Sequence, residues 1–132
     1  MGSKIYYSAL GQAELIRTKE VSSEELTERH IRRIEKYDNE INAVVVRTFD
    51  DALERAKEAD SALARGVLLG PLHGVPMTIK ESYVMANTPS TWGIEAFQNN
   101  YSKSDGLAVR RFRAAGAVFL GKTNVPADLA DF

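Results

Sequence analysis

Three short runs rich in β-branched and aromatic residues alternate with segments of helical periodicity, and this alternation most constrains the fold. The runs are "NAVVVRTF" (42–49), "VPMTIKE" (75–81) and "AVFLG" (117–121). Each run has the length and composition of a strand. Strands that alternate with helices favour an α/β layered fold, in which helices cover the faces of a sheet. We therefore expect a sheet flanked by helices.

The clearest helical segment is "VSSEELTERHIRRIEKYD" (21–38). Ser22 and Glu25 fit a capping box at its start. A shorter helix is expected over residues 8–18. The charged side chains of the longer helix are interpreted as a solvated face. Its apolar stripe consists of Leu26, His30, Ile31, Ile34 and Tyr37.

Two further helices and one long loop complete the expected order. The helices end at Gly66 and Gly116, because glycine commonly follows a helix C-terminus. Residues 86–104 are polar and aperiodic, and they predict a long loop of a kind that is often functional. Another helix is expected to begin near Pro126. The expected capping residues are Asp50 or Asp51 for the first of these helices and Ser104 or Asp105 for the second.

The sequence shows no internal repeat, no low-complexity tract and no interdomain linker. We therefore expect a single partial domain over residues 1–132. It consists of a helical lead-in at about 8–37 and an α/β portion at about 43–132.

Composition excludes several classes of site. Lys plus Arg is 17 and Asp plus Glu is 18, so the net charge of −1 gives no electrostatic reason to expect a nucleic acid or an anionic membrane as partner. Cysteine is absent, which excludes disulfides, thiol nucleophiles and cysteine-rich zinc sites. With His30 and His73 as the only histidines, a histidine-based metal site is disfavoured. The N-terminus has no long apolar run, so we expect no signal peptide, no transmembrane helix and a cytoplasmic location.

One segment imitates a phosphate-binding loop. "GAVFLGKT" (116–123) satisfies the pattern G-x-x-x-x-G-K-[ST]. In a true phosphate loop the strand precedes the first glycine, whereas here a helix precedes Gly116 and the strand is "AVFL" itself. Exposing Val118, Phe119 and Leu120 to a solvated phosphate would lose about 1.5–3 kcal/mol of burial for each side chain. We therefore interpret the segment as a helix end followed by a buried strand.

Lys80 ends the apolar run in "GPLHGVPMTIKES" (70–82). Since alternate residues of a strand share a face, Thr78, Lys80 and Ser82 are expected to point the same way. Lysine is seldom fully buried, so an exposed surface lysine is one interpretation. The other is a general base, because a desolvated amine accepts a proton near neutral pH and activates a serine without histidine.

Two further side chains need an interpretation. His73 lacks the Gly-x-Ser-x-Gly elbow that a triad histidine would serve, so we interpret it as a loop-stabilising residue. Trp92 is the only tryptophan and falls in the expected long loop. It either lines a pocket or covers the edge of the core.

Several ordered motifs together resemble the N-terminal portion of the amidase signature enzymes. These are "GPLHGVPMTIKES", "TWG" and "SDGLAVRRFRAAGAVFLGKTNVPADLADF", with a lead-in helix of the usual kind before them. The resemblance covers the chain from about Ser8 to Phe132. It departs from the usual pattern at Glu81, where many relatives carry aspartate, and at Gly106, where alanine is common.

The resemblance implies an α/β/α fold with a large mixed sheet and hydrolysis or transfer of amides, without a metal or organic cofactor. It implies a Ser–cis-Ser–Lys triad in which Lys80, in the motif GVP-x-x-x-K, is the general base. The substrate is expected to be a small-molecule amide, with Trp92 as a substrate-binding candidate.

In the family, both serines follow the "GKTN" motif, and the sequence ends at Phe132 before any such segment. We therefore expect the nucleophile, the bridging serine and the oxyanion-hole donors to lie outside this chain, and the isolated chain to be inactive. One alternative is a Lys80–Ser82 dyad, with poor attack geometry. Another is a non-catalytic module that forms oligomers or binds a partner through exposed apolar faces.

Overall fold

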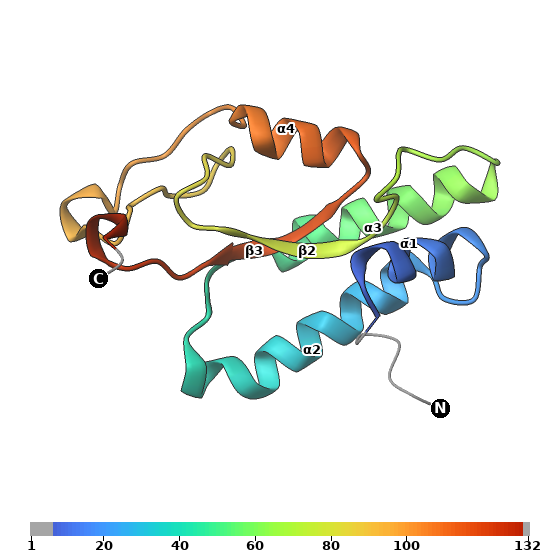
Figure 1. Ribbon diagram of the computed structural model, residues 1–132, viewed down its shortest axis with the longest axis horizontal. Coiled ribbons are helices and arrows are strands. Elements are labelled where there is room, and N and C mark those ends of the chain that lie inside the picture. Colours follow the sequence, from blue (N-terminus) through green and yellow to red (C-terminus); the bar gives the residue numbers. More distant parts are fainter. Residues whose placement is uncertain (1–6, 131–132) are drawn as a thin grey trace.

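The computed structural model describes residues 7–130, so residues 1–6 and 131–132 of the expected domain lie outside the described part. Helices and strands alternate as the sequence predicts (Figure 1). Short 3-10 turns at Glu95–Phe97 and Ala127–Leu129 follow β2 and β3 respectively. The helices are α1 (Ala9–Arg17), α2 (Ser23–Ile41), α3 (Phe49–Ala64) and α4 (Leu107–Ala114), and the strands are β1 (Val44–Arg47), β2 (Pro76–Lys80) and β3 (Val118–Thr123).

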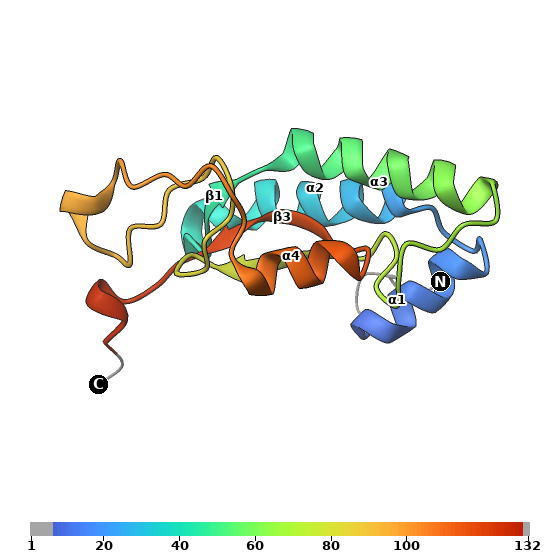
Figure 2. The same cartoon turned by 90° about the horizontal axis from the view of Figure 1, so that it is seen from above.

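The third strand along the chain, β3, is the central strand of a mixed sheet. The strand order is β1-β3-β2, with β1 antiparallel and β2 parallel to β3. Helices α2 and α3 lie on one face of this sheet, and α4 lies on the other (Figure 1 and Figure 2). The expected α/β fold class, a sheet flanked by helices, is confirmed.

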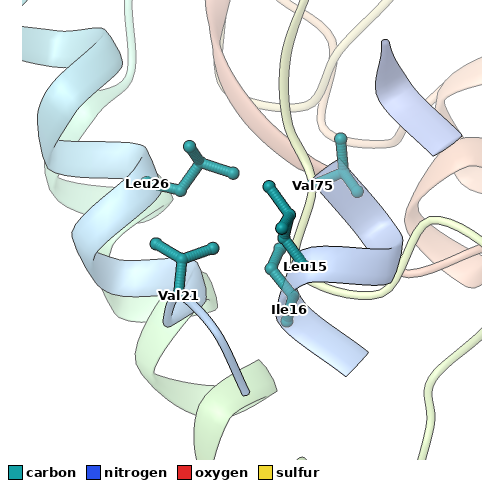
Figure 3. Close-up of a cluster of buried hydrophobic side chains, with 5 residues drawn as sticks. All are labelled: Leu15, Ile16, Val21, Leu26 and Val75. Atoms are coloured by element: carbon teal, nitrogen blue, oxygen red, sulfur yellow. The ribbon is translucent and has the colours of Figure 1, made fainter. Parts of the chain in front are cut away.

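Three clusters of buried side chains join the layers. One fixes the start of β2 against the lead-in helices (Figure 3) and consists of Leu15, Ile16, Val21, Leu26 and Val75. A second joins α2 and α3 to the sheet and contains Ile31, Ala52, Ala56, Val118 and Leu120. A third lies under α4 and contains Ile79, Met85, Val109 and Phe119. Successive residues of β3 thus serve opposite faces, as strand geometry requires.

The Ser22 half of the expected capping box forms at the start of α2, while the Glu25 carboxylate pairs with Arg29. The expected aspartate caps do not form. The Ser22 hydroxyl accepts a hydrogen bond from the Glu25 N–H at 2.9 Å. Helix α3 begins at Phe49 with Thr48 as N-cap, so the assignment of Asp50 or Asp51 is wrong. The Thr48 hydroxyl instead donates to the Phe119 carbonyl at 3.1 Å, which ties the start of α3 to the central strand.

The expected cap of α4 is also wrong. Gly106 is the N-cap and has no side-chain hydrogen bond, so neither Ser104 nor Asp105 fills that role. Asp105 instead accepts from the Ala86 N–H at 2.8 Å and pairs with Arg113, whose Nε lies 3.0 Å from Oδ2. The carboxylate therefore joins the two ends of the long loop, a contact that spacing along the sequence cannot reveal.

The last strand is longer than its apolar run predicts. β3 continues past Gly121 through Lys122 to Thr123. Its pairing with β2 is irregular just before Gly121, and its pairing with β1 is irregular between Val44 and Val46, opposite Thr123 and Lys122. The polar pair after Gly121 looked like the end of the strand, but its backbone still pairs with β1 and β2. The helix expected near Pro126 is only a 3-10 turn, interrupted by Asp128 with φ 54°.

A buried carboxylate closes the connection between α2 and β1. Asp38 accepts hydrogen bonds from the Ala43 N–H at 2.7 Å and the Val44 N–H at 3.1 Å, and Arg47 pairs with it at 3.1 Å. Burial raises the pKa of Asp38, but these N–H groups and the guanidinium outweigh it, so the pKa lies below its ordinary value. The folded state therefore favours the ionised carboxylate.

Because this pKa is depressed, Asp38 stabilises the fold above the unfolded carboxyl pKa of about 3.9 and ceases to do so as pH falls through the folded value. We expect Asp38→Asn to lower the free energy of unfolding at pH 7 and to flatten its dependence on pH in the acid range. Urea unfolding at several pH values measures this. The exposed Glu40→Gln, on the same helix end, is the matched control. An unchanged acid dependence in Asp38→Asn would contradict the prediction.

Candidate active site

The carboxyl ends of β2 and β3 lie side by side because these strands are parallel. Lys80 pairs in register with Thr123, and the Glu81 N–H continues the ladder by donating to the Thr123 carbonyl at 2.9 Å. The long loop and the residues after β3 both extend from this end of the sheet (Figure 1 and Figure 2). Ligand sites of α/β proteins gather at the carboxyl ends of parallel strands. The carboxyl end of β2 and β3 is therefore the candidate position for a functional site.

Lys80 is the last residue of β2, and its side chain is exposed. Among residues 7–130 it makes no ion pair, so its amine is open to a group that approaches the edge. A dry pocket around it would need atoms outside the described residues. The role of Lys80 as a general base stays a prediction.

Ser82 does not share a strand face with Lys80. β2 ends at Lys80, and the Tyr83 N–H donates to the Lys80 carbonyl at 3.0 Å, so the chain turns immediately after the lysine. The expectation that Thr78, Lys80 and Ser82 alternate along one strand is therefore wrong at Ser82. The premise of a Lys80–Ser82 dyad is lost with it.

Trp92 lies in the long loop with 41% of its surface exposed. Its ring packs edge-to-face against Phe97, with 6.0 Å between the ring centroids. Its backbone is left-handed, with φ 54°, and its N–H donates to the Glu81 carboxylate at 3.0 Å. The Trp92 backbone thus lies at the same end of the sheet as Lys80, because Glu81 is the next residue along the chain.

Two buried charges at this edge were not predicted as site residues. Glu81 is 2% exposed and Lys122 is 0% exposed. Both Glu81 oxygens accept backbone N–H groups, from Thr91 and from Trp92. The Lys122 amine donates to the Pro89 carbonyl and to the Ser90 hydroxyl, the latter at 3.0 Å. Burial lowers the pKa of Lys122, and the nearby Glu81 charge partly opposes this shift.

The position of Lys122 explains why the phosphate-loop pattern is misleading here. Val118, Phe119 and Leu120 are buried in the sheet, as the sequence interpretation requires, and the Lys122 amine is already bound within the protein. The sequence signal that could have identified Lys122 is weak. A lysine directly after a buried apolar strand has no local feature that separates a buried from an exposed side chain.

His73 lies at the opposite end of β2. It is 3% exposed, and its Nδ1 accepts from the Leu69 N–H at 3.0 Å. This agrees with its interpretation as a loop-stabilising residue and separates it from Lys80. No group of three or more acidic or imidazole ligands suited to a metal occurs within residues 7–130. Over the same residues, no helix has the length and apolar character needed to span a membrane.

The chain matches known proteins over most of its length. Residues 25–130 match the family model described as Amidase. The chain is 41% identical over 120 residues to a subunit of the glutamyl-tRNA(Gln) amidotransferase of Moorella thermoacetica, covering 91% of this chain and 25% of that protein. It is 39% identical over 120 residues to indoleacetamide hydrolase of Bradyrhizobium diazoefficiens, covering 91% and 23%.

Solved structures agree. The peptide amidase of Stenotrophomonas maltophilia matches with a TM-score of 0.84 and 33% identity, over 92% of this chain and 25% of that one. A bacterial aryl acylamidase, described as an amidase signature enzyme, matches with a TM-score of 0.86 and 30% identity, over 93% and 26%. The chain thus spans about a quarter of the length of these relatives. By its sequence and by its fold, the chain belongs to the amidase family, among the amidase signature enzymes.

Proposed function

We propose that this chain is the N-terminal part of a hydrolase that cleaves the C–N bond of carboxylic amides through a Ser–cis-Ser–Lys triad. Lys80 is the general base, and both serines come from polypeptide outside these 132 residues. The observation that carries the proposal is the position of Lys80. Lys80, the lysine of the motif GVP-x-x-x-K, is the last residue of β2 at the carboxyl end of the parallel strands, and its side chain is exposed.

In the proposed reaction, the nucleophilic serine oxygen attacks the amide carbonyl carbon. The serine proton passes through the bridging serine to the neutral amine of Lys80, which becomes an ammonium. That ammonium then returns a proton through the same path to the leaving nitrogen as the C–N bond breaks. Water hydrolyses the resulting acyl-enzyme ester. Trp92, half-exposed at the same edge, is the proposed contact for the substrate.

The test supplies the missing part of the enzyme from a relative. Residues 8–130 replace the matching quarter of the Stenotrophomonas peptide amidase, to which they are 33% identical. We expect this chimera to release ammonia from peptide amides, and the isolated chain to release none above background. Amide hydrolysis by the isolated chain that disappears in Lys80→Ala would contradict the division of the triad between two parts of the polypeptide.

A second candidate function is association through an exposed apolar face. Leu107 and Phe112 of α4 are 56% and 37% exposed, and with Leu72, Ala108, Arg111 and Ala115 they line a groove of about 390 Å³. The outer edge of β2 is also unpaired within the described sheet. Large apolar faces and free strand edges favour association. For the isolated chain, we propose a second copy as the partner on this face.

We expect the isolated chain to self-associate in solution, and Leu107→Glu to shift it toward the monomer, because a carboxylate in the groove opposes burial. Light scattering coupled to size-exclusion chromatography measures both. Leu10→Glu is the matched control, since Leu10 is 72% exposed on α1 and does not line this groove. A monomeric parent chain at high protein concentration would exclude this candidate.

A further inference from the structure

Glu81 and Lys122 are opposite charges that the proposed reaction does not use, yet both are buried at the end of the sheet where β2 finishes with Lys80. Glu81 is 2% and Lys122 is 0% exposed. Burying a charge is costly unless it is paired and hydrogen-bonded. The hydrogen bonds of the two side chains show which part of the protein they hold in place.

Both side chains bind one short piece of the long loop. From the end of β2, Glu81 accepts the Thr91 and Trp92 N–H groups, the latter at 3.0 Å. From β3, the Lys122 amine donates to the Pro89 carbonyl and to the Ser90 hydroxyl. Four successive loop residues are therefore bound by two charges, one directly after β2 and one on β3. The charges also attract each other, since Glu81 favours the charged form of Lys122.

The bound piece has an unusual backbone. Trp92 has φ 54° and Gly93 has φ 73°. A left-handed conformation is unfavourable for a residue with a side chain, and it persists where its surroundings fix it. A Cβ on Gly93 would lie 2.8 Å from the Pro126 carbonyl oxygen, so the residues after β3 close on this turn from the other side. The Trp92 conformation is thus set by its contacts rather than by local preference.

We propose that Glu81 and Lys122 are positioning residues that hold Pro89–Trp92 against the end of the sheet and so fix the indole relative to Lys80. This inference rests on the proposed function, because it assigns the pair a role in aligning substrate and base. Glu81 directly follows Lys80, so its carboxylate holds the Trp92 backbone to the piece of chain that carries Lys80. Without the pair, the loop would lose the acceptors that the Thr91 and Trp92 N–H groups require.

Hydrogen exchange in the 132-residue chain tests the positioning directly. Glu81→Gln keeps the shape of the side chain but offers one acceptor oxygen in place of two. We expect the Thr91 and Trp92 amides to exchange at least about tenfold faster in this variant. The Val118 amide, bonded to the Val75 carbonyl at 2.9 Å, is the internal reference for the sheet and stays protected. Glu95→Gln, an exposed glutamate of the same loop, is the control variant.

Lys122→Met and Glu81→Asp complete the series. Lys122→Met removes both amine contacts and is expected to speed exchange at the same loop amides. Glu81→Asp retains two carboxylate oxygens and should restore part of the protection lost in Glu81→Gln. If Lys122→Met fails to fold, Glu81→Gln alone tests whether the buried charges hold the loop in place. Thr91 and Trp92 exchange rates within twofold of the parent chain in Glu81→Gln would overturn the inference.

The chimera described above measures the consequence for catalysis. We expect Glu81→Gln to raise KM and lower kcat together, reducing kcat/KM by about 10- to 100-fold, with partial rescue in Glu81→Asp. An unchanged kcat and KM would overturn the role in alignment. An inactive parent chimera would contradict the proposed function alone, because exchange at Thr91 and Trp92 in the isolated chain still decides the positioning.

Discussion

Lys80→Ala in the chimera is expected to lower kcat/KM for peptide amides by about 10³-fold or more. A positioned general base contributes about 10²–10⁴-fold, and members of one triad act as a unit, so losing the base also disables the nucleophile. The side chain of Lys80 is exposed, and its removal leaves the buried clusters of the sheet intact. The loss should therefore appear in kcat rather than in stability.

Lys80→Arg separates the chemistry from the charge. A guanidinium keeps the positive charge but does not give up its proton in proteins, so it cannot accept one from a serine. We expect it to be as inactive as Lys80→Ala. Lys103→Ala, an exposed lysine of the long loop, should retain full activity. Activity of Lys80→Ala within tenfold of the parent chimera would remove Lys80 from the mechanism.

Gly121→Ala is expected to destabilise the chain by about 3 kcal/mol or more. The added Cβ would lie 2.1 Å from the Val46 carbonyl oxygen and 3.1 Å from the Val44 side chain, and φ at this position is 153°. The nearest obstacle is backbone of β1, which cannot rotate away as a side chain can. Strand β1 would have to move off β3, with loss of its pairing to Lys122 and Gly121.

Gly66→Ala is the matched control for this substitution. Gly66 also has positive φ, at 76°, but its added Cβ would meet no atom of residues 7–130 within 4 Å. It should therefore cost only the left-handed strain, about 1–2 kcal/mol. Urea unfolding followed by circular dichroism compares the two variants. A Gly121→Ala chain as stable as Gly66→Ala would show that β1 accommodates the methyl group.

Most parts of the fold that depend on local sequence were predicted correctly, apart from the turn after Lys80 and the 3-10 turn after Pro126. The wrong helix caps have a common physical cause. The Ser22 cap, the end of α3 near Gly66 and the burial of Leu26 and Ile31 in the α2 stripe all depend on residues within a few positions of each other. Tyr37, at the end of that stripe, is 45% exposed against the prediction. Asp105 and Thr48 instead bind partners far along the chain. Propensity and spacing carry no record of such contacts, so the expected caps of α3 and α4 were wrong.

The candidate site also contains residues that could be predicted from the sequence and residues that could not. Lys80 and Trp92 were identified through motifs that resemble a known family, and the fold places both at one end of the sheet. The buried state of Glu81 and Lys122 could not be predicted, because it results from the long loop folding back over the strand ends. The register irregularity beside Gly121 brings Lys122 opposite Ile79. Apolar patterning alone ends the strand before that point.

The strand order has a consequence for how the chain acquires its structure. The strand that pairs with both β1 and β2 in the described sheet, β3, is the last of the three to be synthesised, so β1 and β2 emerge before the partner that they share. The sheet can form only after loops that span much of the chain have closed, and such closure slows folding. Until then, β1 and β2 remain available for mispairing. We therefore expect a growing polypeptide to stay dependent on chaperones until residues 118–123 have left the ribosome.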